Sequence, residues 1–167
     1  MMMFHNFNFK FMSTFTQVCG IDVSKSDLDL CLLNNSTAQV KEKKRISNNL
    51  ESIYAQFSSS RYNNTLFVLE YTGTYSSKVI YQLSHLNRPF SVLNPVQSKN
   101  FMSVLGHTNK NDEQAAYALG LAGRTIPLKL YKAPTKEMQE RKQILTTIRA
   151  LEKQKRSVSN QIHALEQ

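Results

Sequence analysis

Two acidic residues interrupt segments that are otherwise apolar. Asp22 lies between Ile21 and Val23, and Glu70 directly follows the apolar run 65–69. An ionised carboxylate in such a segment costs several kcal/mol unless it is paired or binds a cation. Carboxylate oxygens suit Mg2+ or Mn2+, and two such ions can activate water and stabilise the leaving oxygen of a phosphodiester. The two acids therefore predict a metal site, and a strand-end acid reaching solvent stays open as the alternative for each one alone.

Polar residues near the same predicted loops are candidates for contacts with phosphate. Thr72 and Gly73 follow the second acid, and glycine permits a tight turn whose exposed amides could approach an anion. Lys25, Lys99 and Lys110 could contact a nucleic-acid backbone. An ordinary strand-to-helix connection and solvated lysines remain the alternative readings of these two groups.

The residue pattern places these side chains on alternating strands and helices. Two short β-prone segments read as a hairpin, a charged third segment reads as an edge strand, and the apolar run that ends at Glu70 reads as a buried parallel strand. Asn48 with Glu51 resembles a capping box for the first helix. The expected strands are 18–23, 27–33, 38–46, 65–70 and 89–93, and the expected helices are 49–59, 79–86, 96–105 and 112–123.

Length and composition fit one domain and an appendage. The chain has 167 residues, is 41% hydrophobic and carries a formal net charge of +9. No stretch approaches the roughly 20 apolar residues of a membrane span, and the Phe-rich start lacks a secretion signal, so a cytoplasmic protein without a membrane partner is expected. Cys19 and Cys31 lie in apolar strand-like runs and are expected to be buried, reduced thiols rather than a disulfide.

The basic excess lies mainly at the end of the chain. Residues 124–167 hold ten basic and four acidic side chains, a net +6, and such an excess favours a polyanion such as nucleic acid as a partner. Residues 135–167 lack Gly and Pro and carry apolar residues at heptad spacing, which predicts a long, coiled-coil-like helix suited to forming a homodimer or a higher oligomer. A helix packed on its own domain is the open alternative. The expected organisation is a disordered leader at 1–16, a domain at 17–125, a connector at 126–134 and the basic heptad helix at 135–167.

Four motifs in order resemble those of one family. They are Gly20-Ile21-Asp22-Val23-Ser24-Lys25, Glu70-Tyr71-Thr72-Gly73-Thr74-Tyr75, Asn94-Pro95 with Lys99 and Phe101, and Gly106 with Lys110-Asn111-Asp112. Their order and spacing resemble the DEDD-type insertion-sequence transposases, a group that includes pilin-gene DNA invertases, across roughly residues 17–125. The resemblance implies an α/β fold of the RNase H-like, RuvC type, with a mixed sheet and flanking helices.

The resemblance also implies a function and its residues. Asp22, Glu70 and Asp112 match the first three of four acids that bind Mg2+ or Mn2+ in this family for DNA strand cleavage and exchange. Transposition or site-specific recombination of DNA is therefore the expected activity. DNA is the expected partner, with a structured guide RNA as a further candidate.

The chain departs from the family pattern at the fourth acid. Ala115 stands where the final aspartate is expected, and Glu113 lies about 100° around the helix from Asp112. No segment corresponds to the family's second, serine-bearing domain. The sequence therefore predicts a truncated and impaired transposase, and a non-catalytic fragment that binds nucleic acid or dimerises is the alternative.

Overall fold

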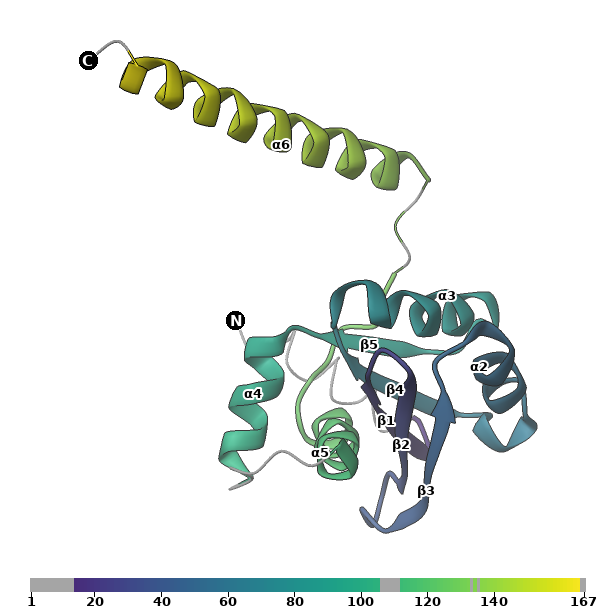
Figure 1. The fold of residues 1–167 in the computed structure, drawn as a ribbon. Helices are drawn as coiled ribbons and strands as arrows, with labels where there is room; N and C mark the ends of the chain where they lie inside the picture. The colour runs from purple at the N-terminus through teal and green to yellow at the C-terminus, as the bar shows by residue number, and fades with distance from the viewer. Residues whose placement is uncertain (1–13, 106–111, 133, 135, 166–167) are drawn as a thin grey trace, which may run out of the picture. The chain divides into compact units, whose positions relative to one another are not determined.

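The computed structural model describes residues 14–105, 112–132, 134 and 136–165 (Figure 1). The chain divides into two units, Met1–Tyr131 and Lys132–Gln167. The first unit contains a five-stranded sheet with helices on both faces, and the second contains a single long helix. The predicted leader, 1–16, lies mostly outside the described residues, although Phe15 packs into the core of the first unit.

The sheet is mixed, with strand order β3-β2-β1-β4-β5. Its strands are β1 (Gln17–Val23), β2 (Asp27–Asn34), β3 (Val40–Ser47), β4 (Thr65–Glu70) and β5 (Phe90–Leu93). β1, β2 and β3 pair antiparallel, whereas β4 pairs parallel with both β1 and β5. This arrangement confirms the predicted antiparallel opening, the charged edge strand and the buried parallel strand.

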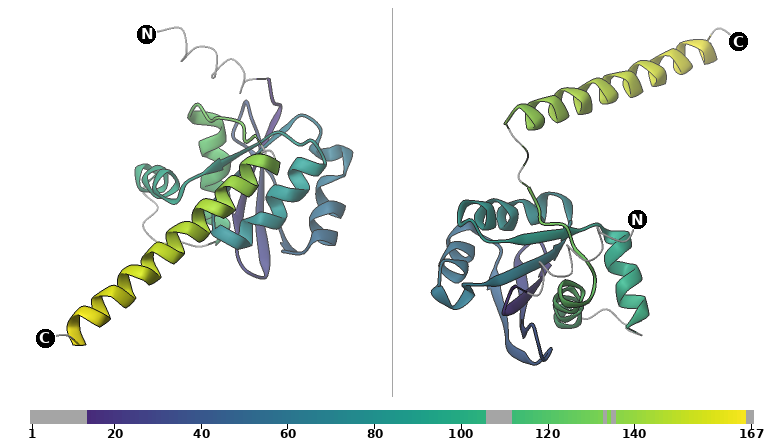
Figure 2. Two further views of the ribbon diagram at one scale, coloured as in Figure 1. Left: turned by 90° about the horizontal axis from the view of Figure 1, so that it is seen from above. Right: turned by 180° about the vertical axis from the view of Figure 1, so that it is seen from behind.

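Helices cover the two faces of the sheet (Figure 2). The helices of the first unit are α2 (Leu50–Phe57), α3 (Ser77–His85), α4 (Pro95–Val104) and α5 (Asp112–Thr125), with short 3-10 helices η1 (Ser60–Tyr62) and η2 (Gly73–Ser76), and the helix of the second unit is α6 (Lys136–Leu165). One core cluster joins α2 and α3 to the side chains of Ile21, Phe67 and Leu69. On the opposite face, α5 packs on Val18, Leu66 and Val68. We call this second side of the sheet the α5 face.

The start of α2 differs from the prediction by one residue. Asn49, not Asn48, is the N-cap, because its side-chain oxygen accepts a hydrogen bond from the Ser52 amide at 2.8 Å. Two adjacent asparagines offer the same capping group, so sequence alone does not separate them. Asn48 is left to make other contacts.

Glycine allows α5 to approach the sheet closely. A Cβ added at Gly20 of β1 would lie 1.9 Å from the carbonyl oxygen of Ala116 and 2.4 Å from the amide nitrogen of Gly120. A Cβ added at Gly123 would lie 2.6 Å from Val18. As β1 runs forward from Val18 to Gly20, its contacts on α5 move back from Gly123 to Ala116. The helix therefore runs antiparallel to β1, and its first turn lies toward the end of β1 that carries Asp22.

The residues after α5 follow β5. Ser91 Oγ donates to the Lys129 carbonyl at 2.8 Å, the Tyr131 amide donates to the Phe90 carbonyl at 2.7 Å, and the Phe90 and Tyr131 rings stack. Residues 126–131 of the predicted connector therefore pack on the first unit.

The two cysteines are free and buried, as predicted. Cys19 belongs to the cluster under α2 and α3, and Cys31 belongs to a cluster with Ala116 of α5. They therefore point to opposite faces of the sheet. No helix in the described part of the chain is long and apolar enough to cross a membrane.

Candidate metal and nucleic-acid site

Three acidic residues line up across neighbouring strands. Asp22 of β1 is the register partner of Asp29 of β2, and on the other side of β1 the parallel register pairs Ile21 with Leu69. The next residues along these two parallel strands are Asp22 and Glu70. Because residues at the same level of a sheet point to the same face, the acids form one row, with Asp22 and Glu70 at the carboxyl ends of adjacent parallel strands.

The row lies on the α5 face. Asp22 is two residues after Gly20, whose missing side chain admits α5, and Asp29 is two residues before Cys31, which packs with Ala116. Side chains two apart along a strand share a face. Asp22 and Glu70 are both half-buried, so this face presents two carboxylates at the end of β1 and β4, next to the first turn of α5.

Asp29 carries its own counter-ion. Arg45, its register partner on β3, donates from Nε to Oδ1 and from Nη2 to Oδ2, each at 2.9 Å. The Asp29 side chain is 11% exposed, whereas the Arg45 side chain is 56% exposed. The bidentate geometry fixes the guanidinium in one orientation. At the level of the acid row, the residue on the next strand, β3, is therefore the basic Arg45. The sequence carried a signal for Asp29, since an acid between Leu28 and Leu30 is as unusual as Asp22 between its neighbours.

Asn48 joins the two segments that follow the acids. Its Nδ2 donates to the carbonyl of Ser24, two residues after Asp22, at 2.8 Å, and to the carbonyl of Tyr75, five residues after Glu70, at 3.0 Å. Lys78 Nζ of α3 donates to the Asn48 carbonyl at 3.0 Å. The residue is 4% exposed. Asn48 therefore holds the β1–β2 turn against the loop after β4.

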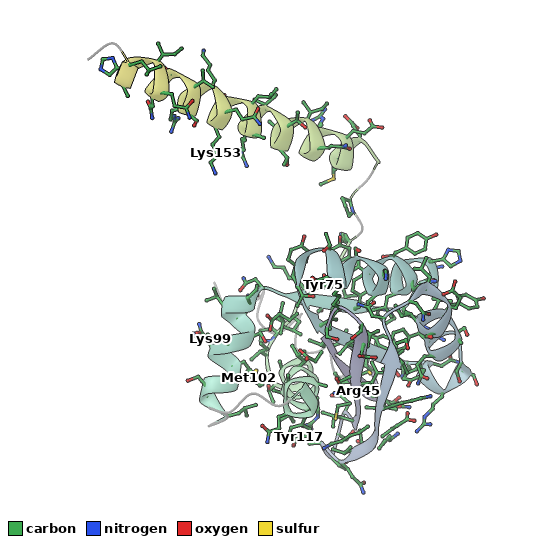
Figure 3. The ribbon with its side chains drawn as sticks, viewed as in Figure 1. Arg45, Tyr75, Lys99, Met102, Tyr117 and Lys153 are labelled. Atoms are coloured by element: carbon green, nitrogen blue, oxygen red, sulfur yellow. The ribbon has the colours of Figure 1, made fainter. Side chains whose placement is uncertain are left out.

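The predicted phosphate-contacting residues are only partly brought together. Lys25 is exposed in the β1–β2 turn, three residues after Asp22, and Thr72 and Gly73 lie two and three residues after Glu70. Gly73 has φ +66 with nothing within 4 Å of an added Cβ, so a glycine is favoured there by backbone conformation and not by packing. Lys99 is exposed on α4 (Figure 3). Lys110 lies outside the described residues.

The third acid and the departure beside it lie at the start of α5. Asp112 is the first residue of the helix, and its side chain is outside the described part of the structure. Ala115 is 2% exposed and packs with Met102 of α4 and with Ala118. The position expected to carry the fourth acid therefore belongs to the apolar contact between α4 and α5.

Asp22 and Glu70 suit a hard divalent cation, because both present carboxylate oxygens on one face at neighbouring strand ends. Among the described side chains, no group of three or more His, Cys, Asp or Glu residues could hold a metal ion. Asp29 adds little, because its carboxylate is occupied by Arg45. The described donor set is therefore two carboxylates, and a complete site needs a further ligand from outside it.

Comparison with known proteins places the chain. Residues 19–166 match the model of the IS110-type DEDD protein family, which is described as transposase. RuvC of T. thermophilus in complex with a Holliday junction substrate is 16% identical, with a TM-score of 0.50 over 70% of this chain and 99% of that chain. A second structure of Thermus thermophilus RuvC is 15% identical, with a TM-score of 0.51 over 69% and 99%. No curated protein gives a significant sequence match. The structural likeness establishes a RuvC-like fold.

Proposed function

Because the chain belongs to the DEDD transposase family, we propose that its first unit is a metal-dependent DNA strand cleavage and exchange domain. The observation that carries the proposal is the placement of Asp22 and Glu70 on one face, at the carboxyl ends of adjacent parallel strands. Family membership alone would be compatible with a chain whose acids had drifted apart. The register keeps these two at the same level of the sheet.

In the proposed mechanism, Asp22 and Glu70 would hold Mg2+ or Mn2+, and Asp112, the first residue of α5, would supply a third carboxylate. A bound divalent cation of this kind polarises a phosphodiester and stabilises the leaving oxygen. Asn48 keeps the segments after the two acids at a fixed separation. Lys25, Thr72 and Gly73 lie on the segments that follow the acids, where a substrate phosphate would arrive. Lys99 and Lys110 are proposed as further contacts with the nucleic-acid backbone.

Ala115 supports an impaired site. It offers no ligand, and its burial against Met102 leaves the position filled by an apolar contact. We therefore propose weaker metal binding than a site with four acids would show. The alternative function is a non-catalytic fragment that binds nucleic acid and dimerises through α6.

The proposed partners are DNA, a structured guide RNA and a second copy of the chain. α6 carries apolar side chains at heptad spacing, and they are exposed in the single chain: Ile144, Ile148, Leu151, Val158, Ile162 and Leu165. An amphipathic helix of this length gains most of its stability from packing its apolar stripe. Pairing of two α6 helices would bury the stripe, and the basic residues of α6 would then be available to a phosphate backbone.

Thermal unfolding with increasing Mn2+ tests the metal site. A ligand that binds only the folded state raises its stability in proportion to the logarithm of ligand concentration, so the wild type should show a rising Tm. Asp22→Asn should abolish the Mn2+-dependent rise. Asp27→Asn, which alters an acid in the same hairpin with its own hydrogen bond to Ser26, should keep it. Equal responses in all three proteins would contradict the metal site.

A gain-of-ligand variant tests the reading of Ala115. Ala115→Asp buries a carboxylate beside Met102, so it should lower the Tm in EDTA. If position 115 lies within reach of the metal, Mn2+ should restore more stability to this variant than to the wild type. An equal Mn2+ response would show that the site cannot be completed from this position. DNA binding without any metal response in either protein would favour the non-catalytic alternative.

A further inference from the structure

The edge strand β3 carries basic side chains on both of its faces, and the hydrogen bonds sort them. Lys44 Nζ donates to Gln56 of α2 at 2.7 Å, so Lys44 lies on the α2 side. Arg45 pairs with Asp29 and so lies on the α5 face. Lys43, two residues before Arg45, shares its face. Lys43 and Arg45 are exposed there, and we call these two residues the β3 basic edge.

The β3 basic edge lies in line with the acid row. Arg45 is the register partner of Asp29, and Asp29 is the register partner of Asp22. Since neighbouring strands are about 4.8 Å apart, β3 lies roughly 10 Å from β1 across the same face. At about 3.4 Å of helix axis per nucleotide, this distance corresponds to about three nucleotides of one strand. A backbone that places one phosphate at Asp22 and Glu70 would therefore bring another within reach of β3.

The pair between Arg45 and Asp29 makes this basic group suitable for a phosphate. The ion pair with Arg45 compensates the negative charge of Asp29, so the acidic site formed by Asp22 and Glu70 does not extend to β3. Lys43 adds a positive charge on the same face of β3. Two hydrogen bonds to Asp29 already hold the Arg45 guanidinium in place, so less side-chain entropy is lost when it binds a phosphate. If the reacting phosphate of a DNA strand lies at a cation bound by Asp22 and Glu70, the positive groups of β3 would face the next phosphates of that strand.

We propose that the β3 basic edge binds the DNA backbone that flanks the reacting phosphate. This proposal rests on the proposed function, because β3 would meet flanking phosphates only if the reacting phosphate lies at Asp22 and Glu70. Charges on an edge strand also oppose unwanted strand pairing. Protection of the edge requires charge on either face of β3, whereas the proposed DNA binding requires it on the α5 face.

The test uses the full chain and a fluorescent DNA duplex, with affinity measured over a range of salt concentrations. Each phosphate contact removed should lower the slope of log K against log salt by about 1. Lys43→Gln should therefore weaken binding several-fold and reduce the slope by about that amount. Lys44→Gln removes the same charge one residue away on the opposite face and should leave both quantities as in the wild type.

The outcomes separate this proposal from the proposed function. Equal losses for the two lysine variants, or no loss for either, would overturn the β3 basic edge while DNA binding itself stands. A wild type that shows no salt-dependent binding to DNA would overturn both proposals. A loss confined to an RNA duplex would assign the surface to RNA and overturn its assignment to DNA. Lys43→Arg, which keeps the charge, should restore the wild-type slope.

Discussion

Single residues fix the geometry of the acids through bonds to main-chain atoms. Asn48 is the clearest case, because one buried amide group donates to carbonyls of two segments that are far apart in the sequence. Its neighbour Asn49 makes a local capping bond instead. The two asparagines thus have the same chemistry and different consequences. They form a matched pair for experiment.

Asn48→Ala should lower the free energy of unfolding by about 2 kcal/mol, since two hydrogen bonds of a buried side chain are lost at about 1 kcal/mol each. Asn49→Ala should cost about 1 kcal/mol, as is usual for a lost N-cap. Urea denaturation measures both. Mn2+ titration of the folded proteins should show weaker binding only in Asn48→Ala. Equal Mn2+ affinity in the two variants would mean that Asn48 stabilises the fold without positioning the acids.

Cys19 gives the protein a predictable response to alkaline pH. Burial raises the pKa of its thiol well above the ordinary value of 9.0, and burial likewise raises the pKa of Tyr62 from 10.0 to about 12. The folded state therefore keeps both protons while the unfolded chain releases them. The resulting stability is complete below pH 9 and is lost as the pH rises, by about 1.4 kcal/mol per unit for each group.

Cys19→Ala removes the first of these contributions. Its urea denaturation curves should show a weaker fall in stability between pH 9 and 10 than those of the wild type, and Tyr62→Phe should change the slope only above pH 10. The same burial should protect Cys19 from alkylation in the native protein. Rapid modification of this thiol at pH 8 would contradict its placement under α2 and α3.

At the scale of elements, sequence patterns predict the strands and their antiparallel or parallel character well and the register between them poorly. The alternation of β2 and the apolar run before Glu70 were enough to predict the antiparallel opening, the buried parallel strand and the strand positions of Asp22 and Glu70, and the family resemblance implied the mixed sheet. The register that sets Asp29 beside Asp22 was not predictable, because pairing depends on contacts between strands and not on either strand alone. Asn48 was wrongly predicted to be the N-cap of α2, because a side-chain amide can either cap a helix or join two segments, and the sequence does not distinguish these roles. Arg45 was predicted only as one of the charges of an edge strand, and its bidentate pair with Asp29 became known from the structure.

The packing of α5 on β1 depends on the absence of a side chain. Gly20→Ala should destabilise the protein by about 3 kcal/mol or prevent folding, because its Cβ would overlap the Ala116 carbonyl and forces the helix to move. Gly73→Ala is the matched control. It meets no atoms but must adopt φ +66, which should cost about 1 kcal/mol. Urea midpoints give both values, and a cost for Gly20→Ala below that of Gly73→Ala would contradict the close approach of α5.

At the scale of the whole molecule, the proposed pairing of α6 helices would determine how many chains act together. Sedimentation equilibrium of the wild type should give the mass of at least two chains, because pairing buries the apolar stripe of α6. Leu151→Asp places a charge in that stripe and should yield monomers. Ala150→Asp introduces the same charge one residue away, outside the heptad positions, and should keep the wild-type mass. Monomeric wild type would favour a stripe that packs within its own chain.

The contact at Gly20 has a consequence for divergence among relatives. Where main chain meets main chain, the distance between α5 and β1 is set by peptide atoms that every sequence possesses. The spacing between the acids on the strands and the start of the helix is then largely independent of which apolar residues fill the core elsewhere. A protein built in this way can exchange most of its side chains and still keep its reactive geometry, as long as one position carries no side chain at all.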